Sequence, residues 1–410
     1  MNHSKLKPFL KAVLTLATER CGAEFEVLLT DHRKSREKFL QNLWADKDSS
    51  SIADQDLVFR EIDYDTIVSM SVDYLNEEEF INFLKELADL SIRYGQLDKG
   101  REVLKRIIKD YSTTIPKQLL GNIYQMLGDT SLHQSDLDTA LVHYIKAQEI
   151  HLANKDDRLY ASALNSEGII HAERGNTQTS LTCFKKAHNY AQSSQDKPLI
   201  IQTSMNLANL SHTLGNYQES LMHLVTTSTL IDPADHATLA KLNHNLGITH
   251  KALHNSQQSL KYFDKAITYA ESSEDYYLRS LSFLEKSEVL TRDGNLMEGT
   301  ALLTTAFQAF SEYGDRLGMA DAYKVFGTIS GQRNTETMAV AFFNNSLRIS
   351  KDSDNLLGLG ETYTAMGDFY GSHGNNKQAL ENYSSAKEYF KTMKAEARIT
   401  EIDTVINNLV

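Results

Sequence analysis

A 40-residue internal period constrains this sequence more than any other feature. Superposing the chain on itself aligns eight small residues, separated by 40, 40, 40, 39, 40, 40 and 40 residues. They are Ala88, Gly128, Gly168, Ala208, Gly247, Ser287, Gly327 and Gly367. A period of this length is typical of chains that stack copies of one structural unit. The sequence therefore predicts a repeat array of eight units.

Each unit carries a turn signal seven residues after its small residue. The turn sites are Gly95, Ser135, Gly175, Gly215, His254, Gly294, Asn334 and Gly374. Glycine adopts backbone conformations that are costly for other residues, and it commonly follows the end of a helix. We therefore expect each unit to be a helical hairpin that reverses direction at this site.

The second helix of each hairpin carries a small residue, a large residue four positions later and usually another small residue after three more. Examples are Ala140/Tyr144/Ala147, Ser180/Phe184/Ala187, Ser259/Phe263/Ala266, Ala339/Phe343/Ser346 and Ala379/Tyr383/Ala386. These offsets place all three side chains on one helical face. We interpret the set as a packing pattern, because small residues admit the neighbouring helix and the ring fills the space between hairpins.

The composition favours helix along the whole chain. Of the 410 residues, 41% are apolar and only four are proline. Because proline interrupts helices, its scarcity leaves long stretches free to be helical. Together with the hairpin period, this predicts an all-α fold.

These repeats resemble the tetratricopeptide family, whose pattern is Leu-Gly, a turn glycine, and then alanine, an aromatic residue and alanine in the second helix. The pattern is seen in LGITHKALHNSQQSLKYFDKA from Leu246 and in MGDFYGSHGNNKQALENYSSA from Met366, and the match covers roughly residues 80 to 392. The period exceeds the usual family value of about 34 residues. Three units have Leu104, Leu224 and Leu303 in place of the aromatic residue. The resemblance implies a right-handed α-solenoid of about eight helical hairpins.

The two ends of the chain lie outside the period. We expect an N-terminal helical region over residues 1–75, the repeats over 76–392 and a C-terminal capping helix over 393–410. Helices are predicted near residues 4–20, 23–45 and 56–75, with a loop at 46–51 and a core stripe of Phe39, Leu43 and Trp44. This region either caps the first hairpin or forms a small bundle with its own partner. The apolar spacing from Ile399 to Leu409 predicts a helix that closes the eighth unit or connects to a further domain.

Charge and cysteine content limit the partners and the compartment. The formal net charge of −12 opposes binding to polyanions, so no nucleic-acid partner is expected. Cys21 and Cys183 are too few and too separated for a disulfide framework, which suits a reducing compartment. The sequence shows neither a signal peptide nor an apolar run of the roughly 18 residues that a membrane span requires. We expect a soluble cytoplasmic protein without a membrane partner.

No sequence pattern supports catalysis or a cofactor. Motifs for phosphate loops, dinucleotide binding, nucleophile elbows and zinc proteases do not occur. His244, His250 and His254 are close in sequence, but in the repeat frame they point toward the groove, the hairpin interior and the turn. We therefore predict no metal site, no cofactor and no enzymatic activity.

A partner is expected to bind the concave face that the first helices of the hairpins line. In units three to five this face is rich in amide and basic groups. The candidate peptide-binding residues are Asn165, Asn206, Asn209, His212, Lys241, His244, Asn245 and Lys251. Asparagine both donates and accepts hydrogen bonds, so it can hold a peptide backbone. Units seven and eight are more acidic, with Asp321, Glu361 and Asp368, and favour a basic segment of the same ligand.

Two functions are compatible with this groove. The first is an interaction scaffold that binds a peptide segment of a partner protein. The second is a regulator that a short peptide switches, because the sequence also resembles, loosely, bacterial Rap proteins, which join an N-terminal helical bundle to such repeats. The lysine and asparagine constellation with which chaperone-binding relatives grip a terminal carboxylate is missing here. A homodimer is also compatible with the sequence, since exposed solenoid ends can pair.

Overall fold

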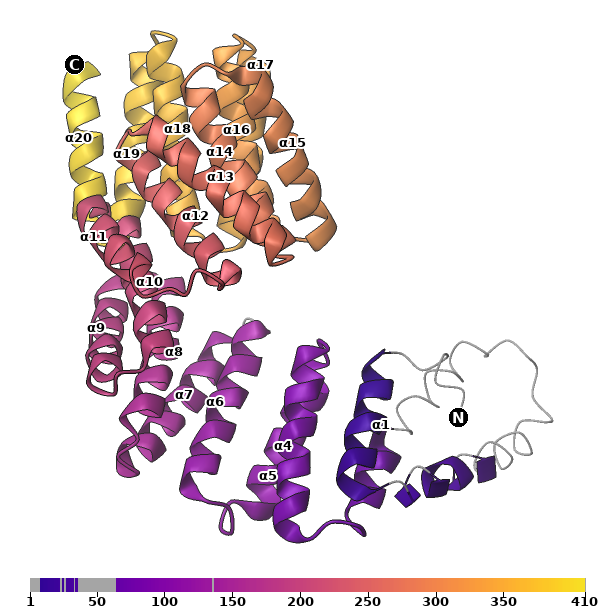
Figure 1. Ribbon diagram of the computed structural model, residues 1–410. Helices are drawn as coiled ribbons and strands as arrows, with labels where there is room; N and C mark the ends of the chain where they lie inside the picture. Colours follow the sequence, from indigo (N-terminus) through magenta and orange to yellow (C-terminus); the bar gives the residue numbers. More distant parts are fainter. Residues whose placement is uncertain are drawn as a thin grey trace. The chain divides into compact units, whose positions relative to one another are not determined.

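A computed structural model describes residues 8–22, 24–25, 27–32, 34–35, 64–134 and 136–409, and it shows helices and connecting turns but no strand in these ranges (Figure 1). The chain divides into two compact units, Met1–Ser166 and Glu167–Val410. The division falls inside one helix, α8 (Asp157–Glu173). None of the described helices is both long and apolar enough to cross a membrane.

The first unit begins with α1 (Pro8–Cys21), and residues 24–35 and 64–71 are helical where they are described. It continues with α4 (Glu77–Arg93), α5 (Leu97–Tyr111), α6 (Lys117–His133) and α7 (Leu137–Ala153). Leu14 and Ala17 of α1 belong to the same buried cluster as Phe83 and Leu84 of α4, so α1 covers the first hairpin. The predicted stripe of Phe39, Leu43 and Trp44 and the predicted loop lie outside the described residues.

The second unit contains the remaining hairpins. Its helices are α9 (Thr177–Ser193), α10 (Lys197–Thr213), α11 (Tyr217–Ser228), α12 (His236–Ala252), α13 (Ser256–Ser272), α14 (Tyr276–Arg292), α15 (Leu296–Tyr313), α16 (Arg316–Gln332), α17 (Glu336–Asp352), α18 (Leu356–Ser372), α19 (Asn376–Thr392) and α20 (Glu396–Leu409). Between Glu77 and Thr392 the helices form the eight predicted hairpins, from α4/α5 to α18/α19. The predicted domain boundaries stay predictions, because the two compact units divide the chain within the repeats.

The backbone at the turn sites confirms the hairpin prediction. Ser135 is outside the described residues, and the other seven sites all have positive φ, from 56° at His254 and Asn334 to 85° at Gly215. This left-handed conformation lets the chain leave the first helix and enter the second. It explains why glycine occupies most of these positions.

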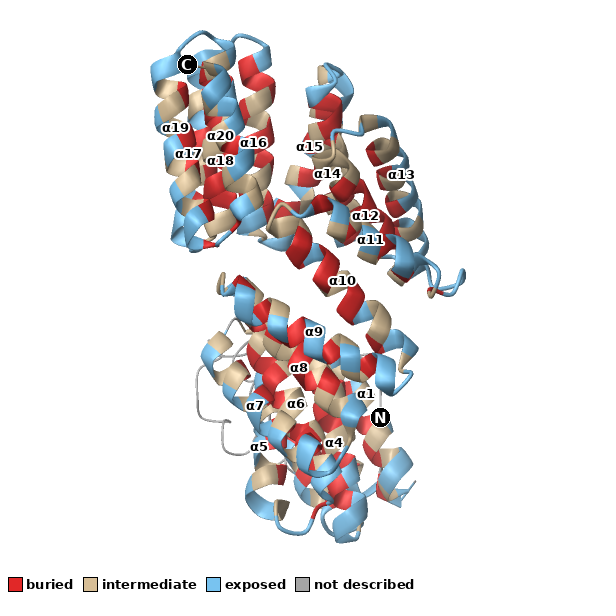
Figure 2. Cartoon of the chain, turned by 90° about the vertical axis from the view of Figure 1, so that its left-hand side faces the viewer, coloured by how far each residue is buried: buried red, intermediate tan, exposed pale blue. Residues whose placement is uncertain are grey.

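The small position of each unit is matched to the size of the residue sixteen positions later. A Cβ atom on Gly247 would lie 2.5 Å from the Phe263 ring, and one on Gly327 would lie 2.6 Å from the Phe343 ring. Where alanine or serine replaces this glycine, the partner is leucine instead of a ring. These pairs are Ala88/Leu104, Ala208/Leu224 and Ser287/Leu303. The buried stripes that result run along the packed faces of the helices (Figure 2).

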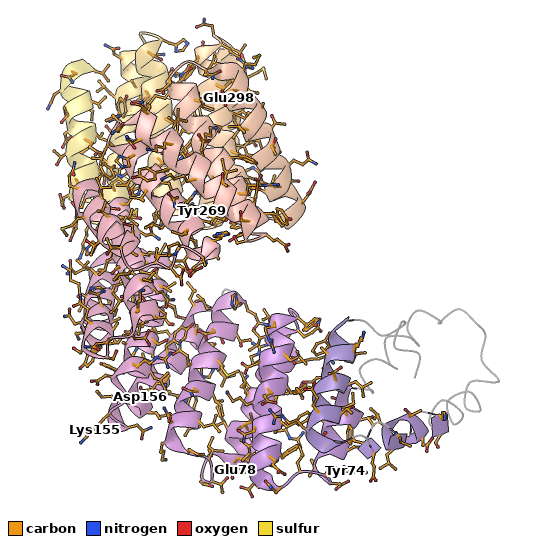
Figure 3. All side chains as sticks on the ribbon, in the orientation of Figure 1. Tyr74, Glu78, Lys155, Asp156, Tyr269 and Glu298 are labelled. Atoms are coloured by element: carbon orange, nitrogen blue, oxygen red, sulfur yellow. The ribbon has the colours of Figure 1, made fainter. Side chains whose placement is uncertain are left out.

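A helix-capping side chain recurs with the same period, just before the first helix of several hairpins. Asp156, at the turn before α8, is labelled beside Lys155 in Figure 3. Its carboxylate accepts a hydrogen bond of 3.0 Å from the backbone N–H of Leu159. The same 3.0 Å cap recurs at Asp196, Asp235, Asp275, Asp315 and Asn355. Each cap satisfies a backbone donor that the helix itself leaves free.

The C-terminal helix α20 touches both ends of the second unit. Ile402 of α20 is buried in the cluster of α18 and α19, which confirms the predicted closing helix. The same end of the chain also contacts α9 and α11, across sequence separations of 216 and 184 residues. Thr177 donates a hydrogen bond of 2.9 Å to the carbonyl of Met393, and Tyr217 donates one of 3.3 Å to Glu401. The second unit is therefore closed on itself through α20.

Candidate functional site

Seven ionisable side chains from five helices of the second unit form one cluster. Six come from α12, α14, α16 and α18, which are first helices of consecutive hairpins, and one comes from α20. They are Lys251, Glu285, Glu288, Asp321, Lys324, Glu361 and Arg398, and we call them the inner charge cluster. The cluster lies on the face where these first helices meet, and it links helices that are far apart in sequence.

Close ion pairs link neighbouring helices of the cluster. The Lys251 ammonium lies 2.5 Å from a carboxylate oxygen of Glu285 and 2.8 Å from one of Glu288. The Lys324 ammonium lies 2.7 Å from Glu361, and the Arg398 guanidinium lies 3.4 Å from the other oxygen of the same carboxylate. Glu361 therefore connects α16, α18 and α20.

The pKa shifts show that these charges interact strongly. Burial alone would raise the pKa of Glu361, but Lys324 and Arg398 outweigh it and hold that pKa well below the usual value. Burial would lower the pKa of Lys324, and Glu361 and Asp321 instead raise it. These groups stay charged at neutral pH.

Asp321 is the least compensated member of the cluster. Its carboxylate lies 3.8 Å from the Lys324 ammonium and its side chain keeps 40% exposure. Burial raises the pKa of Asp321 to about 6, and the attraction of Lys324 only partly opposes this shift. A cationic group placed beside Asp321 would favour its charged form.

The predicted groove residues are placed differently from one another. Asn165 is buried in the first unit, with 2% exposure, and the other seven lie in the second. Asn209 and Lys241 are exposed, and Asn206, His212, Asn245 and Lys251 are half-buried. Lys251 belongs to the inner charge cluster, and His212 interacts electrostatically with its members Arg398, Glu361 and Lys251.

His244 is positioned by the protein itself. It is 8% exposed, its Nδ1 lies 2.9 Å from the Ser282 hydroxyl, and its ring lies beside Phe263. His250 instead stacks on Tyr262, with ring centroids 5.2 Å apart, and His254 occupies a turn. In the described part of the chain, no group of three histidine, cysteine or carboxylate side chains is arranged to hold a metal ion.

Sequence reasoning missed how the charges of the cluster pair. Lys251 and Glu288, Lys324 and Glu361, and Glu361 and Arg398 are each 37 residues apart. This spacing is one 40-residue repeat less about one helical turn. A search for opposite charges at that spacing would have found these pairs, including Arg398 outside the repeats.

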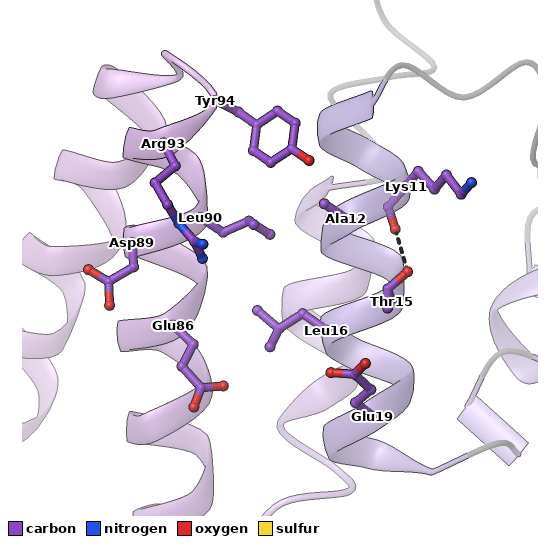
Figure 4. A pocket seen from close by; sticks show the side chains of 10 residues that line it. All are labelled: Lys11, Ala12, Thr15, Leu16, Glu19, Glu86, Asp89, Leu90, Arg93 and Tyr94. Carbon is purple, nitrogen blue, oxygen red and sulfur yellow. Dashed lines mark hydrogen bonds between the residues drawn. The ribbon is translucent and has the colours of Figure 1, made fainter. Parts of the chain in front are cut away.

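The first unit holds two adjoining pockets. The larger, of about 560 Å³, lies between α1 and α4, and Figure 4 shows Lys11, Glu19 and Asp89 on its walls. The smaller, of about 270 Å³, lies between α4 and α6 and shares Asp89. Arg20 of α1 donates a hydrogen bond of 2.8 Å to Glu86 of α4 beside the larger pocket. Both pockets are open clefts; the walls of the larger carry both charges, and those of the smaller carry the carboxylates of Asp89 and Asp129.

The repeat signal is also found by a family comparison. A tetratricopeptide repeat model matches residues 199–272, which cover most of α10, all of α11 and α12, and α13. The helix pairs before and after this match repeat its period and its packing pattern. This chain is a tetratricopeptide-repeat protein.

Solved structures share the fold of this tetratricopeptide-repeat protein at low sequence identity. A Rap protein complexed with competence and sporulation factor is 15% identical, with a TM-score of 0.58 over 92% of this chain and 100% of that one. The apo form of the quorum sensor NprR from B. thuringiensis is 15% identical, with a TM-score of 0.59 over 87% and 99%. The Rap conjugation gene regulator of plasmid pLS20, in complex with the Phr* peptide, is 15% identical, with a TM-score of 0.58 over 95% and 97%. No curated protein matches the sequence.

Proposed function

We propose that this protein binds a peptide segment on the face that the first helices of its second unit form, and that it acts through this interaction. The observation that carries the proposal is the inner charge cluster. Buried or half-buried ion pairs contribute little net stability, and apolar residues of similar volume often stabilise a fold as well or better. Seven ionisable groups on one inner face are therefore better explained by recognition than by folding.

Structures of the same fold support a peptide as the ligand. A Rap conjugation gene regulator is complexed with the Phr* peptide, and NprR is a quorum sensor. The amide side chains predicted for the middle of the groove suit a peptide backbone, because each has a donor and an acceptor. Exposed Asn209 and half-buried Asn245 are available for this role.

The charges indicate which peptide fits. In α12, the exposed ammonium of Lys241 favours an acidic or neutral segment. Near α16 and α18, the weakly paired carboxylate of Asp321 favours a basic side chain or an amino terminus. We expect a peptide whose charge changes sign along its length.

Of the two modes of action, a peptide-switched regulator is favoured over a rigid scaffold. The closure of the second unit by α20 is the observation that favours it. A ligand on the inner face would contact α20 as well as the earlier helices α10 and α12. Its binding would therefore affect whether α20 stays docked on α9 to α11. A scaffold would need no such coupling.

A peptide selection tests the proposal. A random heptapeptide library is panned on the full chain, and the affinity of an enriched peptide is measured by calorimetry. The double variant Asn209→Ala, Asn245→Ala is expected to bind at least about tenfold more weakly, the equivalent of one or two hydrogen bonds. His244 is left unchanged because it is buried against Ser282.

The matched control is the double variant Asn189→Ala, Asn344→Ala. Both residues are exposed asparagines on second helices, α9 and α17. Equal affinity of the two double variants would place the peptide elsewhere on the molecule. Failure of any peptide to bind the wild type would refute the proposed function.

A further inference from the structure

The larger pocket of the first unit is a groove between two helices, and its floor is apolar. Ala12 and Leu16 of α1 and Leu90 of α4 line this pocket of about 560 Å³. Figure 4 shows Leu16 and Leu90 pointing into the space between α1 and α4. Ala12 and Leu16 are only partly buried and pack against the hydrophobic cluster of the first unit. The floor of the groove is therefore an accessible continuation of the core.

Contacts at both ends of the groove hold its two walls. At one end, Arg20 of α1 donates a hydrogen bond of 2.8 Å to Glu86 of α4. At the other end, the ring centroids of Phe9 and Tyr94 lie 5.9 Å apart. The two helices therefore run in opposite directions, and the groove between these contacts is formed before a ligand arrives. A preformed groove lowers the ordering cost of binding.

The charged side chains along the groove are separated by sign. Lys11 of α1 and Arg93 of α4 are exposed near the end marked by Tyr94. Exposed Glu19 lies at the opposite end, beside Glu86. Lys11 and Glu19 are eight residues apart, about 12 Å along a helix, so they do not pair with each other. One end of the groove is basic and the other is acidic.

This arrangement matches a seam where helices pack. Ala12 and Leu16 are four residues apart on α1, and Leu90 and Tyr94 are four apart at the end of α4, so each pair lies on one face. Charged residues beside such a seam determine which helix packs there, as in coiled coils. The groove between two helices accepts the side-chain ridge of a third. A second copy of this concave face would not fill the groove.

We propose that the groove between α1 and α4 binds one amphipathic helix of a partner protein, and that this helix carries an acidic and a basic residue about two turns apart. Its apolar side chains fill the space above Leu16 and Leu90. Its acidic residue lies near Lys11 and Arg93, and its basic residue lies near Glu19. This interaction is separate from the proposed peptide binding, because α1 and α4 belong to the first unit and the inner charge cluster belongs to the second.

Three synthetic helical peptides test this proposal. Each has about 15 residues, enough to form a helix, and one stripe of leucine and alanine. Beside the stripe, two positions two turns apart carry glutamate and lysine in the first peptide, glutamate twice in the second and lysine twice in the third. Fluorescence anisotropy measures their binding to the full chain. We expect the mixed peptide to bind about fivefold more tightly than either of the others, because exposed ion pairs are individually weak.

A charge reversal at one end of the groove tests the location. The double variant Lys11→Glu, Arg93→Glu makes both ends acidic, so the peptide with two lysines should become the tightest ligand. The matched control is Lys109→Glu, Lys117→Glu, which makes the same change at exposed positions of α5 and α6 that do not line the groove. The control should keep the preference of the wild type. Thermal melting shows that both variants remain folded.

The outcomes distinguish this proposal from the proposed function. Failure of all three peptides to bind, or the same order of affinities in the wild type and the groove variant, would overturn the helix-docking site. A dimer of the wild type that the groove variant loses, measured by sedimentation, would overturn it too, because a second copy would then occupy the groove. The heptapeptide measured on the second unit would bind as before in each of these cases.

Discussion

At the scale of single residues, the pairing of glycine with a ring makes a stability prediction. Gly247→Ala places a Cβ atom 2.5 Å from the Phe263 ring, and we expect it to lower the free energy of unfolding by about 1–3 kcal/mol through overpacking. Adding Phe263→Leu should recover most of this loss, because Ala208 and Leu224 already form such a pair. Urea unfolding measures all three proteins.

The control for this prediction is the same substitution where space exists. A Cβ atom on Gly371 in α18 would have its nearest neighbour at 3.6 Å, an ordinary contact. Gly371→Ala should therefore be neutral or stabilise by up to about 1 kcal/mol, since alanine favours helix. If Gly247→Ala were equally well tolerated, close approach of the ring would not explain the glycine.

A second residue-scale prediction concerns acid stability. Burial, assisted by the charge of Lys251, lowers the pKa of His244 to about 4. The folded-state pKa lies below the unfolded value of about 6.5. The stability that neutral His244 contributes is therefore complete at any pH above about 6.5. It is lost as the pH falls from about 6.5 toward 4, and the total loss is roughly 3 kcal/mol.

Urea unfolding at several pH values checks this effect. His244→Gln keeps a polar group near Ser282 but cannot titrate, so the difference in stability between wild type and variant should shrink below pH 6.5. Other histidines, including buried His151 and half-buried His188, also have lowered pKa values and contribute equally to both proteins. Parallel pH profiles would show that His244 does not carry the effect.

Residues of the repeats were predictable because local physics determines them. The turn sites need a left-handed backbone, and the period makes each one visible eight times. The link between Gly247 and Phe263 was present in the sequence, but only the contact distance shows that glycine and ring share one space. The buried contact of His244 with Ser282 joins different repeats and could not be inferred from either residue alone.

At the scale of helices, the docking of α20 depends on a glycine at a crowded turn. Gly215 and Gly294 have nearly equal φ values, 85° and 84°, but only Gly215 has close neighbours, in α20. Gly215→Ala should therefore loosen α20 and speed hydrogen exchange over residues 396–409. Gly294→Ala is the control, because it carries the same backbone strain of about 1 kcal/mol without a contact to α20. Equal exchange of α20 in both variants would contradict this role.

The helices themselves could be predicted, and the contact between distant ones could not. The apolar spacing of Ile399, Ile402 and Ile406 indicated a helix that closes the last hairpin, and it does so. Its contact with α9 to α11 results from small rotations accumulated over several repeats, which no local pattern records. Arg398 was missed as a site residue for this reason.

At the scale of the molecule, closure of the second unit couples peptide binding to the docking of α20. A peptide that contacts α20 as well as α10 and α12 gains all of these contacts only when α20 is docked, so its binding must favour the closed state. At about 100 times its dissociation constant, such a ligand stabilises that state by about 2.7 kcal/mol. This is enough to offset the loosening expected from Gly215→Ala.

Small-angle scattering of the full chain tests this coupling. We expect the Gly215→Ala variant to have a larger radius of gyration than the wild type, and the selected peptide to return it to the wild-type value. The peptide should also slow hydrogen exchange of α20 in both proteins, because closed molecules protect its backbone. A rigid scaffold would bind the peptide with unchanged scattering and unchanged exchange in α20. That result would show that the protein acts as a scaffold. A peptide that binds the open and closed states equally well cannot shift their populations.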